Sequence, residues 1–349
     1  MIQNQRNYGI ELLRLVLMFM VCTLHALAKG GVLSSCSSGT LNYYVYWFME
    51  ICAYCAVDAF ALISGYTAKD KPVNYAKIID MWFQAVFYSF VVTFVFVILG
   101  KYEWGTIEAI KMLMPLNYGN FWYFTAYIGL FVFIPILNKF IFSVSEDTAV
   151  KTFIIIFIMF SCGGIFTDPF NVNYGYSTIW LIILYCLGGL AKRINLFEKK
   201  RTSVLVAMFL ASTTLTWITL CEFGSRILIE YTSPTIVLNG ILLLVIFSRI
   251  TIKGGIISKL SPLAFGIYLF QINPVIWNNY IGGALNFVVN QHIILGVIFV
   301  LCGALCIFVS GLFVEFIRSR VAAVIKIHYL SKIIVKIVKK CTNKISVLL

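Results

Sequence analysis

The sequence predicts an all-α fold: a polytopic integral membrane protein of about ten transmembrane helices with a C-terminal amphipathic helix at the membrane interface. Three observations lead to it: the composition, the lengths of the apolar runs, and the positions of the basic residues. Of the 349 residues, 61% are hydrophobic and 12% are charged, and the mean hydropathy is +0.93. Soluble domains carry about 45–50% apolar and roughly 25% charged residues. This chain therefore has too little polar material to cover a water-soluble fold, and it is too apolar to be disordered.

Ten apolar runs approach the length of about 20 residues that crosses the hydrocarbon core as a helix. They are continuous and do not alternate, which favours helices over the strands of a β-barrel. Pro262 and Pro274 interrupt the pattern late in the chain. The runs cover residues 10–28, 43–66, 76–100, 121–140, 148–166, 176–191, 203–221, 234–247, 260–280 and 293–317.

The first run resembles a secretory signal because it ends in Ala26-Leu27-Ala28. It also contains Arg14 and His25, which the apolar region of a signal peptide would lack. We therefore expect this run to be an uncleaved membrane span.

The basic residues are distributed unequally between the two sides of the ten-span topology. With Arg6 placed in the cytoplasm, 22 of the 27 Lys and Arg residues fall on the inner side and four on the outer side, and Arg14 lies within the first run. The four outer residues are Lys29, Lys101, Lys111 and Arg226. This bias follows the positive-inside rule. It predicts that both termini lie in the cytoplasm, and it accounts for most of the net charge of +13.

Residues 1–317 are predicted to form the membrane-embedded domain and residues 318–349 a basic cytoplasmic tail. Apolar residues recur in the tail at helical spacing, with lysines on the other side. The apolar residues are Leu330, Ile333, Ile334, Ile337 and Val338, and the lysines are Lys332, Lys336, Lys339 and Lys340. The pattern predicts a helix lying on the anionic inner leaflet of the phospholipid bilayer. A nucleic-acid-binding arm is disfavoured, and we expect no nucleic-acid partner.

The cysteines predict no metal site. Most of the 10 Cys residues lie inside apolar runs, and no CxxC pair occupies a polar loop. No internal repeat is visible, which disfavours a transporter built from inverted halves. The sequence defines no oligomeric state.

Ionisable residues within membrane spans are costly, so each is a candidate functional residue. They are Glu11, Arg14, His25, Glu50, Asp58, Asp80 and Glu315. His25 is the one histidine inside a predicted span.

Arg14 and His25 lie eleven residues apart, almost three whole helical turns, so both should face the same way. Their separation along the axis is about 16 Å at a rise of about 1.5 Å per residue. Glu11 lies one turn before Arg14 and is placed to pair with it. Arginine suits phosphate and a neutral imidazole suits general-base catalysis, so the pair fits a donor such as acyl-coenzyme A. Alternatively, Arg14 snorkels to the interface and His25 is a hydrogen-bonded packing residue.

The second run ends in a polar segment. Asp58 stands among apolar residues, so we expect it to have a partner or to line a wet cavity. Ser64 and Gly65 allow a second backbone to approach closely, and helix packing alone would explain them.

Four motifs in this order resemble the membrane acyltransferase 3 family of bacterial integral-membrane O-acyltransferases. The first is an arginine and a histidine separated by ten residues, here Arg14 and His25. The second closes the second span with Val57, Asp58, Phe60, Ser64, Gly65 and Tyr66. The third begins the fourth span with Trp122, Tyr123 and Tyr127 and ends in Pro135, Ile136, Leu137 and Asn138. The fourth consists of Ile267, Tyr268, Leu269 and Pro274. The resemblance runs from about Tyr8 to Ile317.

The resemblance implies transfer of an acyl group, usually acetyl, from acetyl-CoA as co-substrate to a sugar hydroxyl. The implied acceptor is a cell-envelope or exported polysaccharide, such as capsule, exopolysaccharide or O-antigen, or a lipid-linked oligosaccharide. Implied catalytic residues are His25, as base or transient acyl carrier, and Asp58, as its support. Implied donor-binding residues are Arg14, Ser64, Tyr66, Lys69 and Lys77, and implied acceptor-binding residues are Trp122, Tyr123, Tyr268 and Gln271.

Two positions depart from the family pattern, and two other functions compete with acyl transfer. Gln271 stands where the family often has a histidine, and Lys69, Lys71 and Lys77 follow the second span where an arginine is common. A transporter or flippase for a lipid-linked sugar or small anion would use the same buried charges to bind cargo. A sensor or scaffold would leave His25 without a role.

Overall fold

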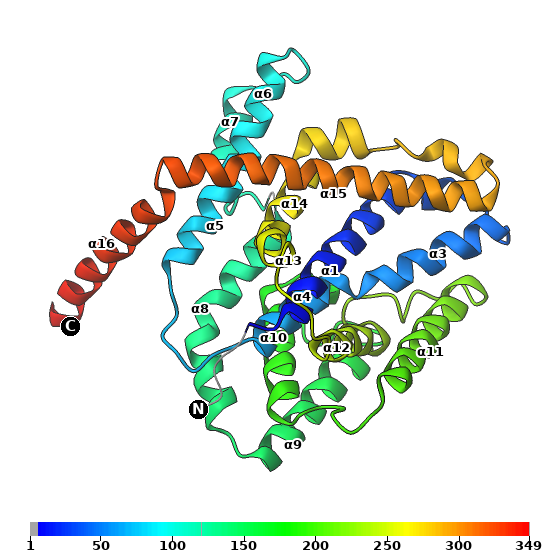
Figure 1. Cartoon of the computed structure of the whole chain (residues 1–349), viewed down its shortest axis with the longest axis horizontal. Helices are drawn as coiled ribbons and strands as arrows, with labels where there is room; N and C mark the ends of the chain where they lie inside the picture. Colours follow the sequence, from blue (N-terminus) through cyan, green and yellow to red (C-terminus); the bar gives the residue numbers. More distant parts are fainter. Residues whose placement is uncertain (1–5, 120, 349) are drawn as a thin grey trace.

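The computed structural model describes residues 6–119 and 121–348, and every regular element within them is a helix (Figure 1). The predicted all-α fold is therefore confirmed. Each predicted run contains helix. The corresponding elements are α1 (Tyr8–Leu27), α3 and α4 (Leu41–Tyr54, Ala56–Tyr66), α5, η1 and α6 (Ala76–Val86, Phe87–Val91, Val92–Ile98), α8 (Trp122–Ser143), α9 and η2 (Glu146–Ile156, Phe157–Cys162), α10 (Thr178–Arg193), α11 (Thr202–Cys221), α12 (Pro234–Ser248), α13, η4, α14 and η5 (Ile257–Leu260, Ser261–Leu263, Ala264–Gln271, Ile276–Ile281), and α15 (Ile293–Val324).

Shorter helices lie in the connections. They are α2 (Val32–Ser35), α7 (Thr106–Leu113), η3 (Asn173–Gly175) and η6 (Asn286–Asn290), and α16 (Ile327–Leu348) ends the described chain.

Six of the described helices are long and apolar enough to cross a membrane. They are Tyr8–Ser35, Leu41–Tyr66, Ala76–Ile98, Trp122–Ser143, Thr202–Cys221 and Ile293–Val324. A bent pair, Ile257–Gln271 with Ile276–Asn290, makes a seventh if it is one span. Helix α12 is apolar but has only 15 residues, and α10 has 16. The protein is thus an integral membrane protein by the length and composition of its helices, and the count of ten stays a prediction.

The bent pair turns by 78° where Pro274 interrupts the chain. Asn273 satisfies the backbone at this break: its Oδ1 accepts from the backbone N–H groups of Val275 (3.0 Å) and Ile276 (3.3 Å). Its Nδ2 donates to the carbonyl of Tyr88 (2.7 Å) and to Thr93 Oγ1 (2.9 Å). A broken helix is tolerated inside a membrane protein when neighbouring protein groups replace the lost backbone bonds. Asn273 therefore fixes the bend and ties it to α5–α6.

Helix α1 lies in the middle of the molecule (Figure 1). It packs against α3, α4, α12, α14 and α15. Asn7 caps it, its Oδ1 accepting from the backbone N–H of Ile10 at 3.1 Å, and Asn7 Nδ2 also donates to the carbonyl of Ser248 (2.8 Å). Leu13 and Leu17 are fully buried. A capped and buried central helix holds its polar residues at fixed positions relative to its neighbours.

Helices α4 and α10 pack backbone against backbone through glycines. A side chain at Gly65 would collide with the carbonyl of Tyr185, and one at Gly188 would collide with the carbonyl of Leu62. Glycine is enriched at helix contacts in membranes because it allows this close approach. The close approach predicted at Gly65 is present in the structure.

Helix α15 is the longest helix and runs along one side of the molecule (Figure 1). Most of its large apolar side chains are exposed, as expected of a surface in contact with lipid. Its one buried acid, Glu315, is 2% exposed and pairs with Arg318 through two bonds of 2.7 Å. The hydroxyl of Tyr88 donates to the same carboxylate at 2.9 Å. A buried charge that is paired in this way carries a structural role.

A short turn separates α15 from α16, and in this turn Lys326 has a φ of 56°. Helix α15 continues past the predicted domain boundary at residue 317 and ends at Val324, and α16 then packs against α5. His328 Nδ1 lies 2.7 Å from Asp80 Oδ2, so Asp80 has a partner in the tail. The tail is helical, and its binding to the membrane surface stays a prediction.

Replacement of Gly188 by alanine should destabilise the protein by about 1–3 kcal/mol, because the new methyl group would push α10 away from the backbone of α4. Thermal unfolding of the purified protein in detergent measures the effect. Gly303→Ala is the matched control, since a methyl group there meets only the flexible end of the Leu285 side chain. Equal melting temperatures for the two variants would contradict the prediction.

Candidate active site

One cavity of about 870 Å³ lies along α1, the helix in the middle of the fold. Residues from both ends of α1 line it, including Glu11, Arg14 and His25. The two predicted functional residues of the first run therefore open onto a common space, as their shared helix face predicts. The residues from other helices that line the cavity and that the argument uses are Ser64 of α4, Trp122, Tyr123 and Tyr127 of α8, Ser261 and Tyr268 of the η4–α14 segment, and Trp277 of η5.

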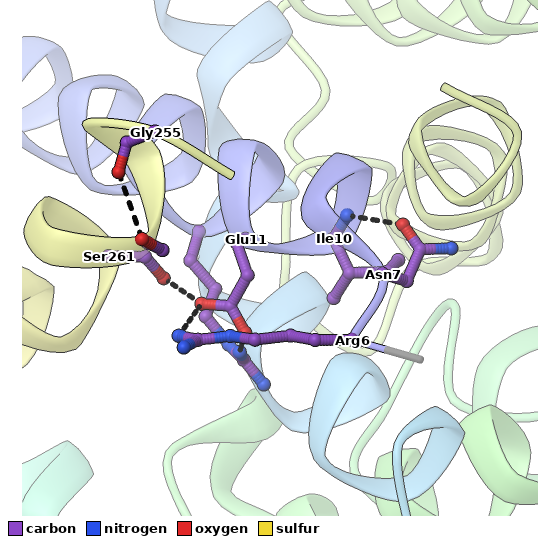
Figure 2. Close-up of polar contacts among 8 residues, drawn as sticks. Arg6, Asn7, Ile10, Glu11, Gly255 and Ser261 are labelled. Carbon is purple, nitrogen blue, oxygen red and sulfur yellow. Dashed lines mark hydrogen bonds and ion pairs between the residues drawn. The ribbon is translucent and has the colours of Figure 1, made fainter. Parts of the chain in front are cut away.

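The end of the cavity where α1 begins is a polar mouth built around Glu11. Its carboxylate pairs with Arg14 (2.8 Å) and with Arg6 (3.1 Å), and it accepts a hydrogen bond from the hydroxyl of Ser261. Figure 2 shows Arg6 and Ser261 converging on Glu11. The predicted pairing of Glu11 with Arg14 is confirmed. Two guanidinium groups against one carboxylate leave a net positive charge, which suits an anionic ligand.

His25 lies farther along α1 and is held by two residues of the bent pair. Its Nδ1 lies 3.0 Å from Oε1 of Gln271, and its ring packs edge-on against Trp277 at 4.8 Å between centroids. The Gln271 Nε2 amide points to the sulfur of Met18 at 3.7 Å, so the amide presents its oxygen to the histidine. An amide oxygen only accepts, so this contact is a hydrogen bond when Nδ1 carries the proton, which leaves the lone pair on Nε2. Nε2 is then the ring nitrogen left to accept a proton or a hydrogen bond.

Aromatic residues of α8 and α14 form another part of the cavity wall. The backbone N–H of Tyr123 donates to the hydroxyl of Tyr268 (3.3 Å), and the two rings lie 6.1 Å apart. Tyr127 lies parallel to Tyr123 at 6.4 Å, and its hydroxyl is 3.5 Å from Ser64 Oγ. The Tyr123 hydroxyl has no hydrogen-bond partner among the described residues. It is therefore free to donate to a substrate oxygen.

Asp58 is 1% exposed and lies off the cavity wall. Its Oδ1 accepts from the indole N–H of Trp180 at 3.0 Å, so the expected partner exists. Its Oδ2 has no partner among the described residues. The structure pairs His25 with Gln271, and the supporting role predicted for Asp58 stays a prediction.

The predicted site residues separate into two groups in the structure. His25, Arg14, Ser64, Trp122, Tyr123 and Tyr268 line the cavity. Tyr66, Lys69 and Lys77 do not line it, and Gln271 reaches it only through His25. The Tyr66 ring lies under the Lys192 ammonium group at 5.5 Å, and the Lys69 carbonyl accepts from Asn138 (3.2 Å). Donor binding by Tyr66 and the two lysines stays a prediction.

The cavity also contains residues to which the sequence analysis gave no role at a site. They are Arg6, Trp47, Glu50, Tyr54, Tyr176, Arg226, Tyr231, Ser261 and Trp277. Glu50 was already a candidate functional residue in the sequence because it is an acid inside a span, but no role at a site was assigned to it. The loop residues Arg226 and Tyr231 carried no local signal, because only the fold brings them to the wall. Among the described residues, no cluster of three or more His, Cys, Asp or Glu is placed to hold a metal ion.

Fold and cavity together define a helical integral membrane protein with a partly buried imidazole facing an internal cavity that has a basic mouth. Residues 7–313 match the family model described as an acyltransferase domain, and the chain therefore belongs to the acyltransferase 3 family. It is a membrane acyltransferase. No curated protein and no solved structure matched the chain in the same comparisons.

Replacement of Gln271 by methionine, which has a similar volume, should lower kcat for acyl transfer up to about tenfold, since one hydrogen bond that orients His25 is lost. The KM for the acyl donor should change little, because Gln271 lies off the cavity wall. Steady-state kinetics measure both constants, with Gln291→Met, outside the cavity, as the control. An unchanged kcat would show that Gln271 does not position the histidine.

Proposed function

We propose that the protein transfers an acetyl group from acetyl-CoA to a hydroxyl of a cell-envelope or exported glycan, with His25 as general base. One observation carries the proposal: Arg14 and His25 line the same cavity, about 16 Å apart along one helix. Coenzyme A carries phosphates at one end and the thioester at the other. The basic mouth would hold the phosphates while the thioester reaches the imidazole.

The reaction then follows from the arrangement of the side chains. Nε2 of His25 takes the proton of the acceptor hydroxyl as its oxygen attacks the thioester carbonyl. The new C–O bond forms and the C–S bond breaks, and the imidazolium returns the proton to the leaving thiolate. The products are an acetyl ester and coenzyme A. The Tyr123 hydroxyl is free to stabilise the negative charge that develops on the carbonyl oxygen.

The orientation in the membrane is part of the proposal. The charge bias of 22 inner against four outer basic residues supports a cytoplasmic N-terminus. The polar mouth at the start of α1 would then open toward the cytoplasm, where acetyl-CoA is made. The protein would lie in the bacterial cytoplasmic membrane with both termini inside.

Replacement of His25 by alanine should lower acetyl transfer by a factor of about 10²–10⁴, the usual contribution of a general base. The assay measures coenzyme A release by the purified protein, with acetyl-CoA and polysaccharide extracted from the cell envelope of the source cells. His292→Ala is the matched control, because this histidine is exposed and outside the cavity. Full activity in His25→Ala would refute the catalytic role, and release that does not depend on polysaccharide would refute the proposed acceptor.

Replacement of Arg14 by methionine should raise the KM for acetyl-CoA about tenfold or more, because a charge-assisted bond to phosphate is lost. The KM for S-acetyl-N-acetylcysteamine should not change, since this donor has the thioester but no phosphate. Lys199→Met, an exposed residue outside the cavity, is the control. Equal increases of KM for both donors would show that Arg14 does not recognise the phosphates.

A further inference from the structure

Four aromatic rings meet at the part of the cavity wall formed by the start of α8 and the ends of two loops. This distal aromatic cluster consists of Tyr54, Trp122, Tyr176 and Tyr231. Tyr54 and Tyr231 stack at 4.7 Å with an angle of 25° between the rings. Trp122 lies 4.6 Å from Tyr176 and 6.2 Å from Tyr231. All four residues line the cavity and present it with a broad apolar surface.

A buried acid adjoins this cluster. Glu50 lies one turn before Tyr54 on α3, so both lie on one helix face, and both line the cavity. Glu50 is 6% exposed, and its Oε2 has no hydrogen-bond partner among the described residues. An unpaired buried carboxylate oxygen is costly, so its presence calls for a ligand that donates to it.

A second unpaired group lies beside the acid. Trp47 is one turn before Glu50 on the same face and also lines the cavity. Its indole N–H has no acceptor among the described residues. The guanidinium of Arg226 lies 5.8 Å from the Trp47 ring and places a positive charge on this side of the cavity. The site thus offers one acceptor, one donor and a stacking surface.

We infer that the distal aromatic cluster, with Glu50 and Trp47, binds one sugar ring of the acceptor. A pyranose has C–H groups on its faces and hydroxyls at its edge. The faces would stack on the electron-rich rings, a hydroxyl would donate to Glu50 Oε2, and the Trp47 indole would donate to a sugar oxygen. A purely apolar ligand would leave both Glu50 Oε2 and the Trp47 indole N–H unpaired. This inference rests on the proposed function, since it assigns the acceptor of that reaction.

The cluster is continuous with the reaction site. The Trp122 ring lies 5.4 Å from the Tyr123 ring, and Tyr123 contacts Tyr268 on the wall that His25 shares. Trp122 begins α8, and Tyr231 lies three residues before Pro234, where α12 begins. In the predicted topology, these helix ends face the outer side of the membrane. The acceptor would therefore enter from the outer side, and the donor from the mouth at Arg14.

Replacement of Glu50 by glutamine tests the site. The KM for the extracted envelope polysaccharide should rise about tenfold or more, while the KM for acetyl-CoA stays within twofold of the original value. Glu50→Asp keeps a carboxylate and should restore part of the affinity. Glu103→Gln, an exposed acid outside the cavity, is the matched control and should change neither constant.

Replacement of Tyr231 by leucine provides an independent test, because it removes the ring that contacts all three other members of the cluster. It should raise the polysaccharide KM several-fold, again without changing the KM for acetyl-CoA. Unchanged polysaccharide KM values in both variants, with the unsubstituted protein active, would overturn this inference alone. If the unsubstituted protein acetylates no fraction of the polysaccharide, the proposed function itself fails.

Discussion

The structure depends on a line of polar contacts between α1 and the segment from Ser261 to Gln271. Polar groups inside a membrane protein must be satisfied by other protein groups, because the hydrocarbon offers none. Glu11 meets Ser261, which is 250 residues away, and His25 meets Gln271, which is 246 residues away. One contact lies at Ser261, where η4 begins, and the other at Gln271, where α14 ends, so together they fix the position of the η4–α14 segment along α1. The same contacts orient the groups that face the cavity, so the packing of these two segments also builds the site.

Two buried acids, Glu315 and Glu50, differ in whether other residues of the protein pair with them. Glu315 is satisfied by Arg318 and Tyr88 and lies away from the cavity wall. Glu50 lies on the wall and keeps an unpaired oxygen. A membrane fold tolerates a paired acid such as Glu315, because its bonds link two helices. An acid on the cavity wall with an unpaired oxygen, such as Glu50, adds no stability to the fold until a ligand pairs with it. Its presence inside a span therefore indicates a role in function.

Interactions between residues close together in the sequence could be predicted, whereas interactions between distant segments could not. Contacts within one helix were predictable, because the 3.6-residue period places Glu11, Arg14 and His25 on one face. The positions of the helices were accessible for the same local reason, and Pro274 marked the interruption at which the chain bends. The packing of Gly65 against α10 was indicated by its small size. The number of helices that cross the whole membrane does not follow from length alone, because α10 and α12 are apolar but have only 16 and 15 residues.

Contacts between distant segments could not be read in this way. Asp58 has the partner expected of a buried acid, but nothing local identifies Trp180, 122 residues away, as that partner. Gln271 looked like a loss relative to a family histidine, and the structure shows that its amide oxygen orients His25. Arg226 and Tyr231 belong to a loop without a recognisable pattern, and only the packing of α11 and α12 against α3 and α4 brings them to the cavity.

The shape of the cavity sets a condition on the proposed chemistry. Water is a competing acceptor for any thioester held near an activated base, so transfer to a sugar requires that the sugar replace water at His25. Trp277 packs against His25, and Tyr123 and Tyr268 line the same cavity, so much of the lining is aromatic and offers water few partners. A sugar ring seated on the distal aromatic cluster would fill the approach from the other side. Binding of the acceptor would then complete the exclusion of water, and the base would meet a thioester and a hydroxyl together only when both substrates are bound.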